Sequence, residues 1–252
     1  MKIFLNYDDE NTESLKIRDE ISRICEVIAD INYADLTISI GGDGTFLKSP
    51  KDKPLIGINT GTLGYLTEIS PEHINDALDD ITKGNYYIEN RMMLEGEVIR
   101  PNGDVLKIPP ALNEIGLSKN AFGVVRFNVN INGKLINSYT ADGILLCTPT
   151  GSTAYNLSCG GPIVDPTAEI ITLTPIAPHS ILNRSIVLSD KSIVEIEITE
   201  LRENTSAYVL YDGKPIEALN GDIIRIRKSD EITKIIKLEN GSFIDTVREN
   251  IN

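Results

Sequence analysis

The chain has 252 residues, of which 41% are hydrophobic and 24% charged, and its formal net charge is −13. That length accommodates one large domain or two smaller ones, each with a sizeable core. The acidic balance argues against nucleic-acid binding, because phosphate backbones are held mainly by clustered Lys and Arg and no such cluster occurs in the sequence. The three cysteines, Cys25, Cys147 and Cys159, form neither a CxxC pair nor a zinc pattern, which predicts inert thiols in a reducing cytoplasm.

Neither a secretion signal nor a membrane span is expected. The N-terminal segment becomes acidic at Asp8-Asp9, before a signal-length apolar run develops. No apolar stretch approaches the roughly 20 residues that cross a bilayer. The sequence therefore predicts a cytoplasmic protein that binds neither membranes nor nucleic acid.

Residues 1–90 alternate strand-like and helix-like stretches. Apolar residues recur at helical spacing from about Thr12 to Ala29. A second helix is expected to begin with Ser70 as N-cap and Pro71 as its first residue, and to stop at Gly84. This alternation is typical of an open, largely parallel, Rossmann-like α/β sheet. The strands expected in this part are Ile3–Leu5, Leu36–Ile40 and Pro54–Asn59.

The segment Gly41-Gly42-Asp43-Gly44-Thr45 follows one of these strands and precedes an apolar stretch that could open a helix. Glycines allow a ligand to approach the backbone closely, and the N–H groups of a first helical turn point at an anion. The segment therefore predicts a phosphate site. Asp43 is unexpected there, because a carboxylate repels phosphate. It could hold a metal or accept a proton from an attacking hydroxyl, and the structural alternative is that it only caps the helix.

After about residue 91 the pattern changes to short strand-like runs separated by turn signals such as Asn132-Gly133 and Asp212-Gly213. Closely spaced strands of this kind predict a β-rich second domain, of sandwich type. Apolar residues four apart in Ser242–Ile251 predict a final helix. The strands expected in this half are Leu94–Arg100, Val105–Ile108, Ala111–Ser118, Val124–Ile131, Ile144–Cys147, Ser185–Leu188, Ile193–Thr199, Ala207–Tyr211 and Ile223–Arg227.

These patterns predict a domain organisation. We expect an N-terminal α/β domain over residues 1–91 and a β-sandwich-type domain over residues 92–236. The helix within residues 237–252 is expected to pack back on the first domain. Because no low-complexity linker separates the domains, they are expected to abut, with the active site in the interdomain cleft.

A second polar segment, Thr148–Tyr155, follows the buried strand Ile144–Cys147 and is rich in hydroxyl groups. It predicts another helix N-terminus, suited to hydroxylated or phosphorylated ligands. Taken alone, a run of small polar residues is more often only a loop. Its combination with the glycine segment is what indicates a shared function.

Gly41–Thr45 alone is shared by NAD kinases, diacylglycerol-type lipid kinases and, more loosely, phosphofructokinases. Together with Asn113-Glu114 and Thr148–Tyr155, it makes the sequence closely similar to the NAD kinases. The similar blocks extend over about residues 36–214. Further blocks that strengthen the resemblance are Gly57–Tyr65, Asp142-Gly143, Pro175–His179 with Asn183-Arg184, and Asp212-Gly213-Lys214.

The resemblance implies transfer of the terminal phosphoryl group of ATP, or of polyphosphate, to the 2′-hydroxyl of the adenosine ribose of NAD, giving NADP. By similarity, Asp43 is the general base, and Gly42 and Gly44 let phosphates lie against the backbone. Asn113 is expected to read the adenine edge, and Glu114 to hold ribose hydroxyls. The resemblance also implies a homodimer or homotetramer. Magnesium is expected to arrive with the nucleotide, because no acidic cluster indicates a dedicated metal cage.

Further substrate-binding positions follow from the same resemblance. Asp142 matches a position that contacts the nicotinamide side, and Lys48 could place a cation near the phosphates, although a solvated lysine is the alternative. Thr140 stands where many relatives have Arg or Lys, and Lys214 stands where glutamine is common and is expected to compensate in part. The other positions are Tyr65, Thr153, Ala154, Tyr155, Ser158, Ala177 and Asp212.

Two alternatives remain open from the sequence. A lipid or sugar kinase could share Gly41–Thr45, but Thr148–Tyr155 and the lack of a basic or amphipathic membrane-docking face argue against it. A non-catalytic dinucleotide sensor could share the binding residues. Asp43 argues against a sensor, because binding alone would improve without a negative charge beside phosphates.

Overall fold

The computed structural model describes the chain except for residues 62–63, 121–122, 180–182, 203–204, 239–242 and 252. It divides into two compact units: unit 1 comprises Met1–Arg91 and Thr233–Asn252, and unit 2 comprises Met92–Ile232. None of the helices in the described part of the chain has the length and apolar character needed to span a bilayer.

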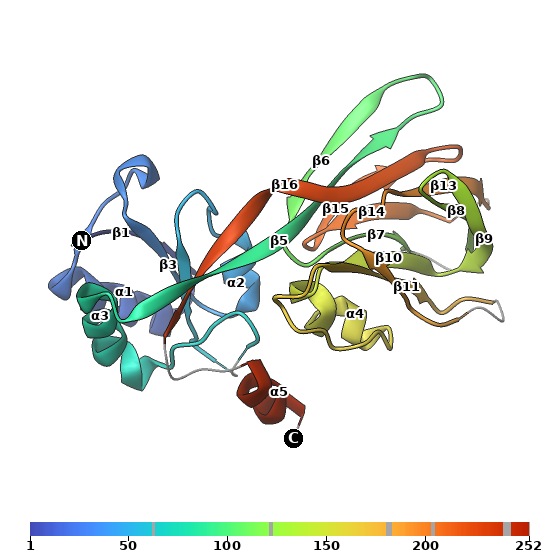
Figure 1. Ribbon diagram of the computed structural model, residues 1–252. Coiled ribbons are helices and arrows are strands. Elements are labelled where there is room, and N and C mark those ends of the chain that lie inside the picture. Colours follow the sequence, from blue (N-terminus) through green and yellow to red (C-terminus); the bar gives the residue numbers. More distant parts are fainter. Residues whose placement is uncertain (62–63, 121–122, 180–182, 203–204, 239–242, 252) are drawn as a thin grey trace. The chain divides into compact units, whose positions relative to one another are not determined.

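Unit 1 is built on a parallel sheet with the strand order β2-β1-β3-β4, and the last part of β16 adds to it by pairing in parallel with β4. Figure 1 shows these strands with the helices of the unit. The strands are β1 Lys2–Tyr7, β2 Glu26–Val27, β3 Leu36–Ile40, β4 Leu55–Ile58 and β16 Ile223–Leu238. The helices are α1 Thr12–Ile24, α2 Asp43–Lys48, α3 Ile74–Lys83 and α5 Phe243–Ile251, with 3₁₀ turns η1 Ile31–Tyr33 and η2 Pro71–His73.

The two central strands explain the stability of unit 1. Every residue of β3 and β4 is buried, which is the pattern of parallel strands covered on both faces. Their isoleucines form one core with the apolar faces of α1 and α3. The predicted open α/β sheet is therefore confirmed.

The helix boundaries differ in part from the prediction. The helix predicted from Thr12 to Ala29 is too long, because Cys25 has an extended backbone and Glu26–Val27 pair with β1 instead. Pro71 begins a 3₁₀ turn and the α-helix starts only at Ile74, but it ends at Gly84 with a left-handed φ of 79°, as expected for a glycine C-cap. The predicted C-terminal helix is confirmed by α5, and Ser242 lies outside the described residues.

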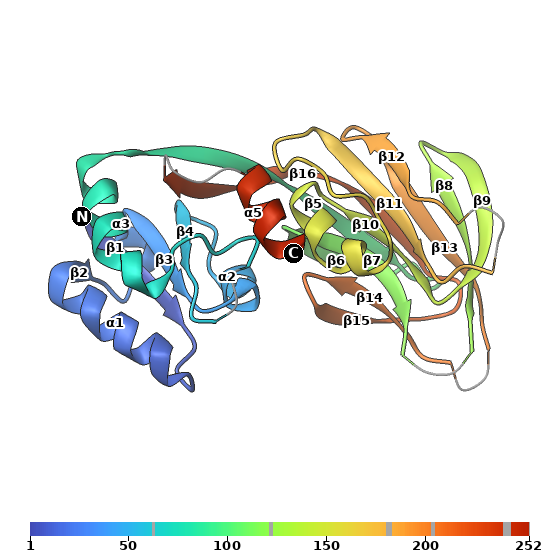
Figure 2. The same ribbon diagram turned by 90° about the horizontal axis from the view of Figure 1, so that it is seen from below.

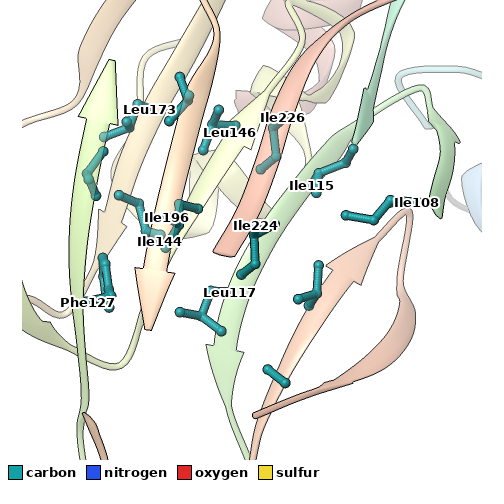
Figure 3. Packing of buried hydrophobic residues seen from close by; sticks show 14 of the residues in the cluster. Ile108, Ile115, Leu117, Phe127, Ile144, Leu146, Leu173, Ile196, Ile224 and Ile226 are labelled. Atoms are coloured by element: carbon teal, nitrogen blue, oxygen red, sulfur yellow. The ribbon is translucent and has the colours of Figure 1, made fainter. Parts of the chain in front are cut away.

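Unit 2 consists of two antiparallel sheets whose inward faces share one hydrophobic core, so the predicted sandwich is confirmed. In Figure 3, Phe127 and Ile196 of the first sheet and Ile144, Leu146 and Leu117 of the second belong to this core. The first sheet contains β5 Tyr86–Ile99, β6 Val105–Ala111, β8 Val125–Ile131, β9 Lys134–Ala141, β13 Val194–Leu201 and the first part of β16. The second, in the order β12-β11-β10-β7-β14-β15, contains β12 Ile186–Ser189, β11 Ile170–Ile176, β10 Gly143–Cys147, β7 Glu114–Lys119, β14 Ala207–Tyr211 and β15 Lys214–Ala218.

The alternation of side chains in the second sheet places polar groups on its outer face. Ile115 and Leu117 of β7 point into the core, so Glu114 lies on the opposite face. Cys147 is paired directly with Glu114, and Thr172 with Cys147, so these three residues form a row across that face. The segment after β10, with η3 Thr150–Thr153 and α4 Tyr155–Ser158, lies beside β10 and β11 in both views (Figures 1 and 2).

Candidate functional site

The predicted phosphate segment forms a sharp turn between β3 and α2. Gly41 has a φ of 153°, and an added Cβ there would overlap Thr45, so the position requires glycine. Gly42 is the N-cap residue of α2, and Gly42 and Gly44 are both exposed, with open space where a Cβ would lie. Backbone at these positions is therefore open to a ligand. Lys48 is exposed in the last turn of the same helix.

The carboxylate of Asp43 is held by the loop after β4. Its Oδ2 accepts a hydrogen bond from the Tyr65 N–H at 3.0 Å, and its Oδ1 accepts one from the Leu66 N–H at 3.1 Å. An added Cβ at Gly64 would overlap the carboxylate, so glycine allows this close approach. Asp43 remains partly exposed. The arrangement fixes the orientation of the carboxylate while leaving it accessible, as a proton acceptor requires. Thr62 and Leu63 of the predicted Gly57–Tyr65 block lie outside the described residues.

Asn113 and Glu114 are buried, with exposed fractions of 6% and 8%. Asp212 holds the backbone before them: its Oδ2 accepts the Leu112 N–H and its Oδ1 the Asn113 N–H, both at 2.8 Å. The Asp212 N–H in turn donates to the Glu114 carbonyl at 3.2 Å. Asp212 was predicted to bind substrate, and the structure shows that both of its carboxylate oxygens already accept backbone hydrogen bonds.

The segment that follows β10 also forms hydrogen bonds with the backbone of Leu112 and Asn113. The Thr148 hydroxyl donates to the Leu112 carbonyl at 2.6 Å, and the Thr148 N–H donates to the Asn113 carbonyl at 2.9 Å. An added Cβ at Gly151 would overlap Asn113, so this glycine permits the close packing. Asn113 and Glu114 are thus positioned by two turns that are distant in the sequence.

The side chain of Glu114 has unused hydrogen-bonding capacity. Within the described part of the chain, its buried Oε2 has no hydrogen-bond partner. Burial, with a further contribution from the charge of Asp212, raises the pKa of Glu114 to about 7. Burial and the neighbouring Glu114 likewise raise the pKa of the Cys147 thiol to about 12, which keeps this thiol inert at neutral pH. A hydroxylated ligand would satisfy the free oxygen of Glu114.

Tyr155 interacts with Ser118 of β7, with Cys159 and with Asp142. Burial and Cys159 raise the pKa of Tyr155, Asp142 adds to the rise, and a hydrogen bond with Ser118 opposes it. Asp142 also forms an ion pair with Lys119 at 2.7 Å. The structure therefore brings Asn113, Glu114, Asp142, Tyr155 and Asp212 into one region of unit 2.

The remaining predicted residues of unit 2 are placed as follows. The Thr140 carbonyl accepts the His179 N–H at 2.8 Å. Ala177 is exposed and has a φ of 43°, a conformation that costs energy for a residue with a side chain. The Lys214 ammonium lies 6.0 Å from the centre of the Tyr211 ring. Thr153 and Ala154 are half-buried, and Ser158 is exposed at the end of α4.

Two polar residues with no predicted role, Thr148 and Asn156, hold this region together. Asn156 is fully buried and bonds three segments. Their only signal in the sequence is their place within the Thr148–Ser158 run, because the partners of Asn156 include residues up to 18 positions away.

An α/β unit that carries a Gly-Gly-Asp-Gly-Thr turn, together with a β-sandwich unit that carries a buried Asn-Glu pair, defines the class of two-domain kinases that use this turn. Two family models identify the member of that class. The model of the ATP-NAD kinase N-terminal domain matches residues 4–86, and that of the ATP-NAD kinase C-terminal domain matches residues 112–238. The chain belongs to the NAD kinase family, and its function is that of an NAD kinase.

Individual relatives agree with this assignment. The NAD kinase of Thermoanaerobacter sp. (strain X514) is 41% identical over 225 residues, which cover 86% of this chain and 78% of the relative. The NAD kinase of Carboxydothermus hydrogenoformans is 40% identical, with 91% of this chain and 83% of the relative covered.

Two solved structures are similar to this chain. An NAD kinase from Archaeoglobus fulgidus in complex with ATP has a TM-score of 0.79 and 27% identity, covering 99% of each chain. Yeast NADH kinase complexed with NADH has a TM-score of 0.90 and covers 100% of this chain and 87% of the yeast chain. Because its identity is 21%, the yeast structure supports the fold alone.

Proposed function

We propose that Asp43 is the general base of this NAD kinase and takes the proton from the 2′-hydroxyl of the adenosine ribose of NAD. In that step the ribose oxygen forms a bond to the terminal phosphorus of ATP, and the bond from that phosphorus to the bridging oxygen breaks, leaving ADP and NADP. The observation that carries the proposal is the carboxylate of Asp43, which two backbone N–H groups fix while it stays partly exposed. A fixed acceptor lowers the barrier by positioning, even where its proton affinity is below that of the alcohol.

The residues of unit 2 are proposed to hold the dinucleotide. Glu114 would bond ribose hydroxyls through its free Oε2, and Asn113 would read the adenine edge. Tyr155 would offer its ring face, and Asp142 would contact the nicotinamide side. Further proposed contacts are Tyr65, Thr140, Thr153, Ala154, Ser158, Ala177, Asp212 and Lys214, with Gly42, Gly44 and Lys48 at the phosphates.

Magnesium is proposed to bind with ATP. Among the described residues, no group of three or more His, Cys, Asp or Glu could hold a metal ion, so protein groups are expected to share a magnesium ion with nucleotide phosphates. The metal would neutralise charge that develops on the transferred phosphoryl group. We also propose that the protein is cytoplasmic and forms a homodimer or homotetramer. Sedimentation of the purified protein would test the oligomeric state.

The test is the Asp43→Asn variant. It keeps the shape of the side chain but cannot accept the hydroxyl proton, so kcat is expected to fall by about 10²–10⁴-fold while NAD still binds. Steady-state NADP formation gives kcat, and calorimetry gives the affinity for NAD. The matched control is Asp35→Asn, which also alters a carboxylate that accepts a backbone N–H in unit 1, here from Lys2. Its kcat is expected to stay within about twofold of the parent.

Other outcomes would contradict the proposal. An Asp43→Asn variant with undiminished kcat would show that Asp43 is not the base. Wild-type protein that binds NAD but forms no NADP with either ATP or polyphosphate would indicate a sensor. Preferential phosphorylation of diacylglycerol would indicate a lipid kinase, so one matrix of donors against acceptors separates these cases.

A further inference from the structure

Asn156 lies in α4, between the proposed dinucleotide contacts Tyr155 and Ser158, and its side chain is fully buried. Its Nδ2 donates to the Ser152 carbonyl at 3.1 Å and to the Pro162 carbonyl at 3.2 Å. Its Oδ1 accepts the hydroxyl of Thr174 in β11 at 2.7 Å. One amide therefore joins the turn before α4, the loop after it and a strand of the sheet beneath.

The chemistry of the partners fixes the orientation of this amide. Both partners of Nδ2 are carbonyl oxygens, which can only accept, so the NH₂ group must face them. Thr174 then uses its single proton toward Oδ1, and the Ser185 hydroxyl, 2.8 Å away, must donate to Thr174. Four hydrogen bonds link these groups into one network, so a replacement that changes one member leaves another unpaired.

The contact with Thr174 sets α4 on the face of the sheet that carries Glu114. Thr174 pairs directly with Leu145, and Leu145 with Gly116, two residues beyond Glu114 in β7. Residues paired in this way point to the same side of a sheet, as do residues two apart in a strand. The loop after α4 is packed as closely, because a Cβ at Gly161 would overlap the Asn156 side chain.

We infer that Asn156 is a positioning residue for NAD: it holds the α4 segment, with Tyr155 and Ser158, over the Glu114 face in the geometry that binds the dinucleotide. The inference rests on the proposed function of these residues. It assigns Asn156 no contact with ATP and no part in the chemical step. Loss of its amide should weaken NAD binding and leave phosphoryl transfer from bound substrates nearly unchanged.

Two variants of nearly the same size test this role. Asn156→Asp replaces the NH₂ group by an oxygen that cannot donate to the two carbonyls, and Asn156→Leu removes every hydrogen bond without adding charge. We expect both to raise the KM for NAD about tenfold or more, because two hydrogen bonds are lost in Asn156→Asp and three in Asn156→Leu, with the KM for ATP within about twofold and kcat within about threefold of wild type. Thr174→Ser keeps the hydroxyl and should retain nearly the wild-type KM values. Thr174→Val removes the hydroxyl and should raise the KM for NAD by about threefold.

The matched control for stability is Val129→Ala in the sandwich core, where a fully buried side chain of the other sheet is shortened. It should lower the melting temperature without changing either KM, since Val129 belongs to the core and not to the α4 region. A general structural role of Asn156 predicts the same behaviour for the Asn156 variants, with loss of active protein at constant KM, and that result would overturn the inference. A KM change confined to Asn156→Asp would also overturn it, because the added charge would then be the cause.

Direct measurement of NAD binding keeps this test separate from the proposed catalytic function. If the wild-type protein bound NAD but formed no NADP, the proposed base would be wrong, while weaker NAD binding by both Asn156 variants in calorimetry would still support the positioning role. Unchanged NAD affinity in folded variants would refute that role even if wild-type turnover were normal.

Discussion

Each unit contains one of the two carboxyl groups to which we assign proposed roles, and the surroundings of the two groups are opposite. In unit 1, both oxygens of Asp43 accept backbone N–H groups from one loop, and the side chain is partly exposed. In unit 2, Glu114 is buried, its Oε2 has no partner among the described residues, and burial beside Asp212 raises its pKa to about 7.

The difference suits the two tasks that we propose for the same functional group. Backbone N–H groups of the protein donate to both carboxylate oxygens of Asp43. This carboxylate therefore keeps one orientation before any ligand arrives, as suits an acceptor of protons. Glu114 has lost hydration without a full replacement, and a ligand that offers hydroxyl groups would supply what is missing. Stability is therefore sacrificed at Glu114, the carboxyl proposed to bind substrate, and not at Asp43, the proposed base.

Among the variants that test this contrast between Asp43 and Glu114, Gly64→Ala is expected to have the largest effect on kcat. The added methyl group overlaps the Asp43 carboxylate and must displace it from the loop N–H groups. Because a shift of about 1 Å in a catalytic group costs up to about 10²-fold, kcat for NADP formation should fall by about 10- to 100-fold, although Asp43 itself is unchanged.

Gly61→Ala is the matched control for this loop, since among the described residues no atom lies within 4 Å of an added Cβ there. Steady-state kinetics of NADP formation give kcat for both variants. Equal kcat values for the two would mean that the orientation of Asp43 does not matter, and the contrast with Glu114 would then fail.

The second largest effect is expected from Glu114→Gln, on the free energy of unfolding and on the affinity for NAD. A carboxyl whose pKa is raised in the folded state contributes most to stability below the unfolded-state pKa, near 4, and loses that contribution as the pH rises toward about 7. The neutral amide avoids the loss. Glu114→Gln should therefore gain about 1–3 kcal/mol in free energy of unfolding at pH 8 and almost nothing near pH 4, while NAD affinity falls by about tenfold.

Urea unfolding at the two pH values and calorimetry with NAD give these quantities. Glu68→Gln serves as control, because Glu68 is paired with Lys237 at 2.8 Å and its replacement should yield no gain at pH 8. A Glu114→Gln variant that is less stable than wild type at pH 8 would show that Glu114 is satisfied in the folded protein.

The smallest effect is expected from Lys48→Ala. Lys48 is exposed, so water screens its charge, and its removal should raise the KM for ATP by no more than about threefold. Lys53→Ala changes a half-buried lysine of unit 1 whose ammonium donates to the Asn32 carbonyl, and it should leave the KM for ATP unchanged. A tenfold rise for Lys48→Ala would mean that unit 1 binds phosphate with a cation as well as with backbone N–H groups.

Sequence reasoning succeeded where structure depends on nearby residues. The strand Leu36–Ile40 is found as predicted, because a short run with β-branched residues that ends in two glycines determines it locally. The turns at Asn132-Gly133 and Asp212-Gly213 are also found, with left-handed φ values that these residues accept.

Prediction from the sequence failed for strands whose pairing partners are distant along the chain. β9, β11 and β15 were not predicted, and β5 and β16 are longer than expected, with 14 and 16 residues. In β16 the polar run Ser229–Glu231 interrupts the apolar alternation, and only pairing with other strands extends the strand across it.

The same limit applies to the site. Its residue types were predictable from the motifs, but the N–H groups that hold Asp43 come 22 and 23 residues later, and those that bond Asp212 lie 99 and 100 residues away. No local pattern encodes such contacts. The roles of Gly64, Thr148 and Asn156 therefore emerge only from the folded chain.

The division of unit 1 between the two ends of the chain has a consequence for biosynthesis. Unit 2 is complete at Ile232, whereas unit 1 still needs residues 233–252. During synthesis the chain therefore has every residue of the sandwich before it has the segment that pairs with Leu55 of β4. Until that segment is in place, the free edge of β4 can pair with another chain, which makes the last part of β16 a guard against aggregation as well as part of the fold.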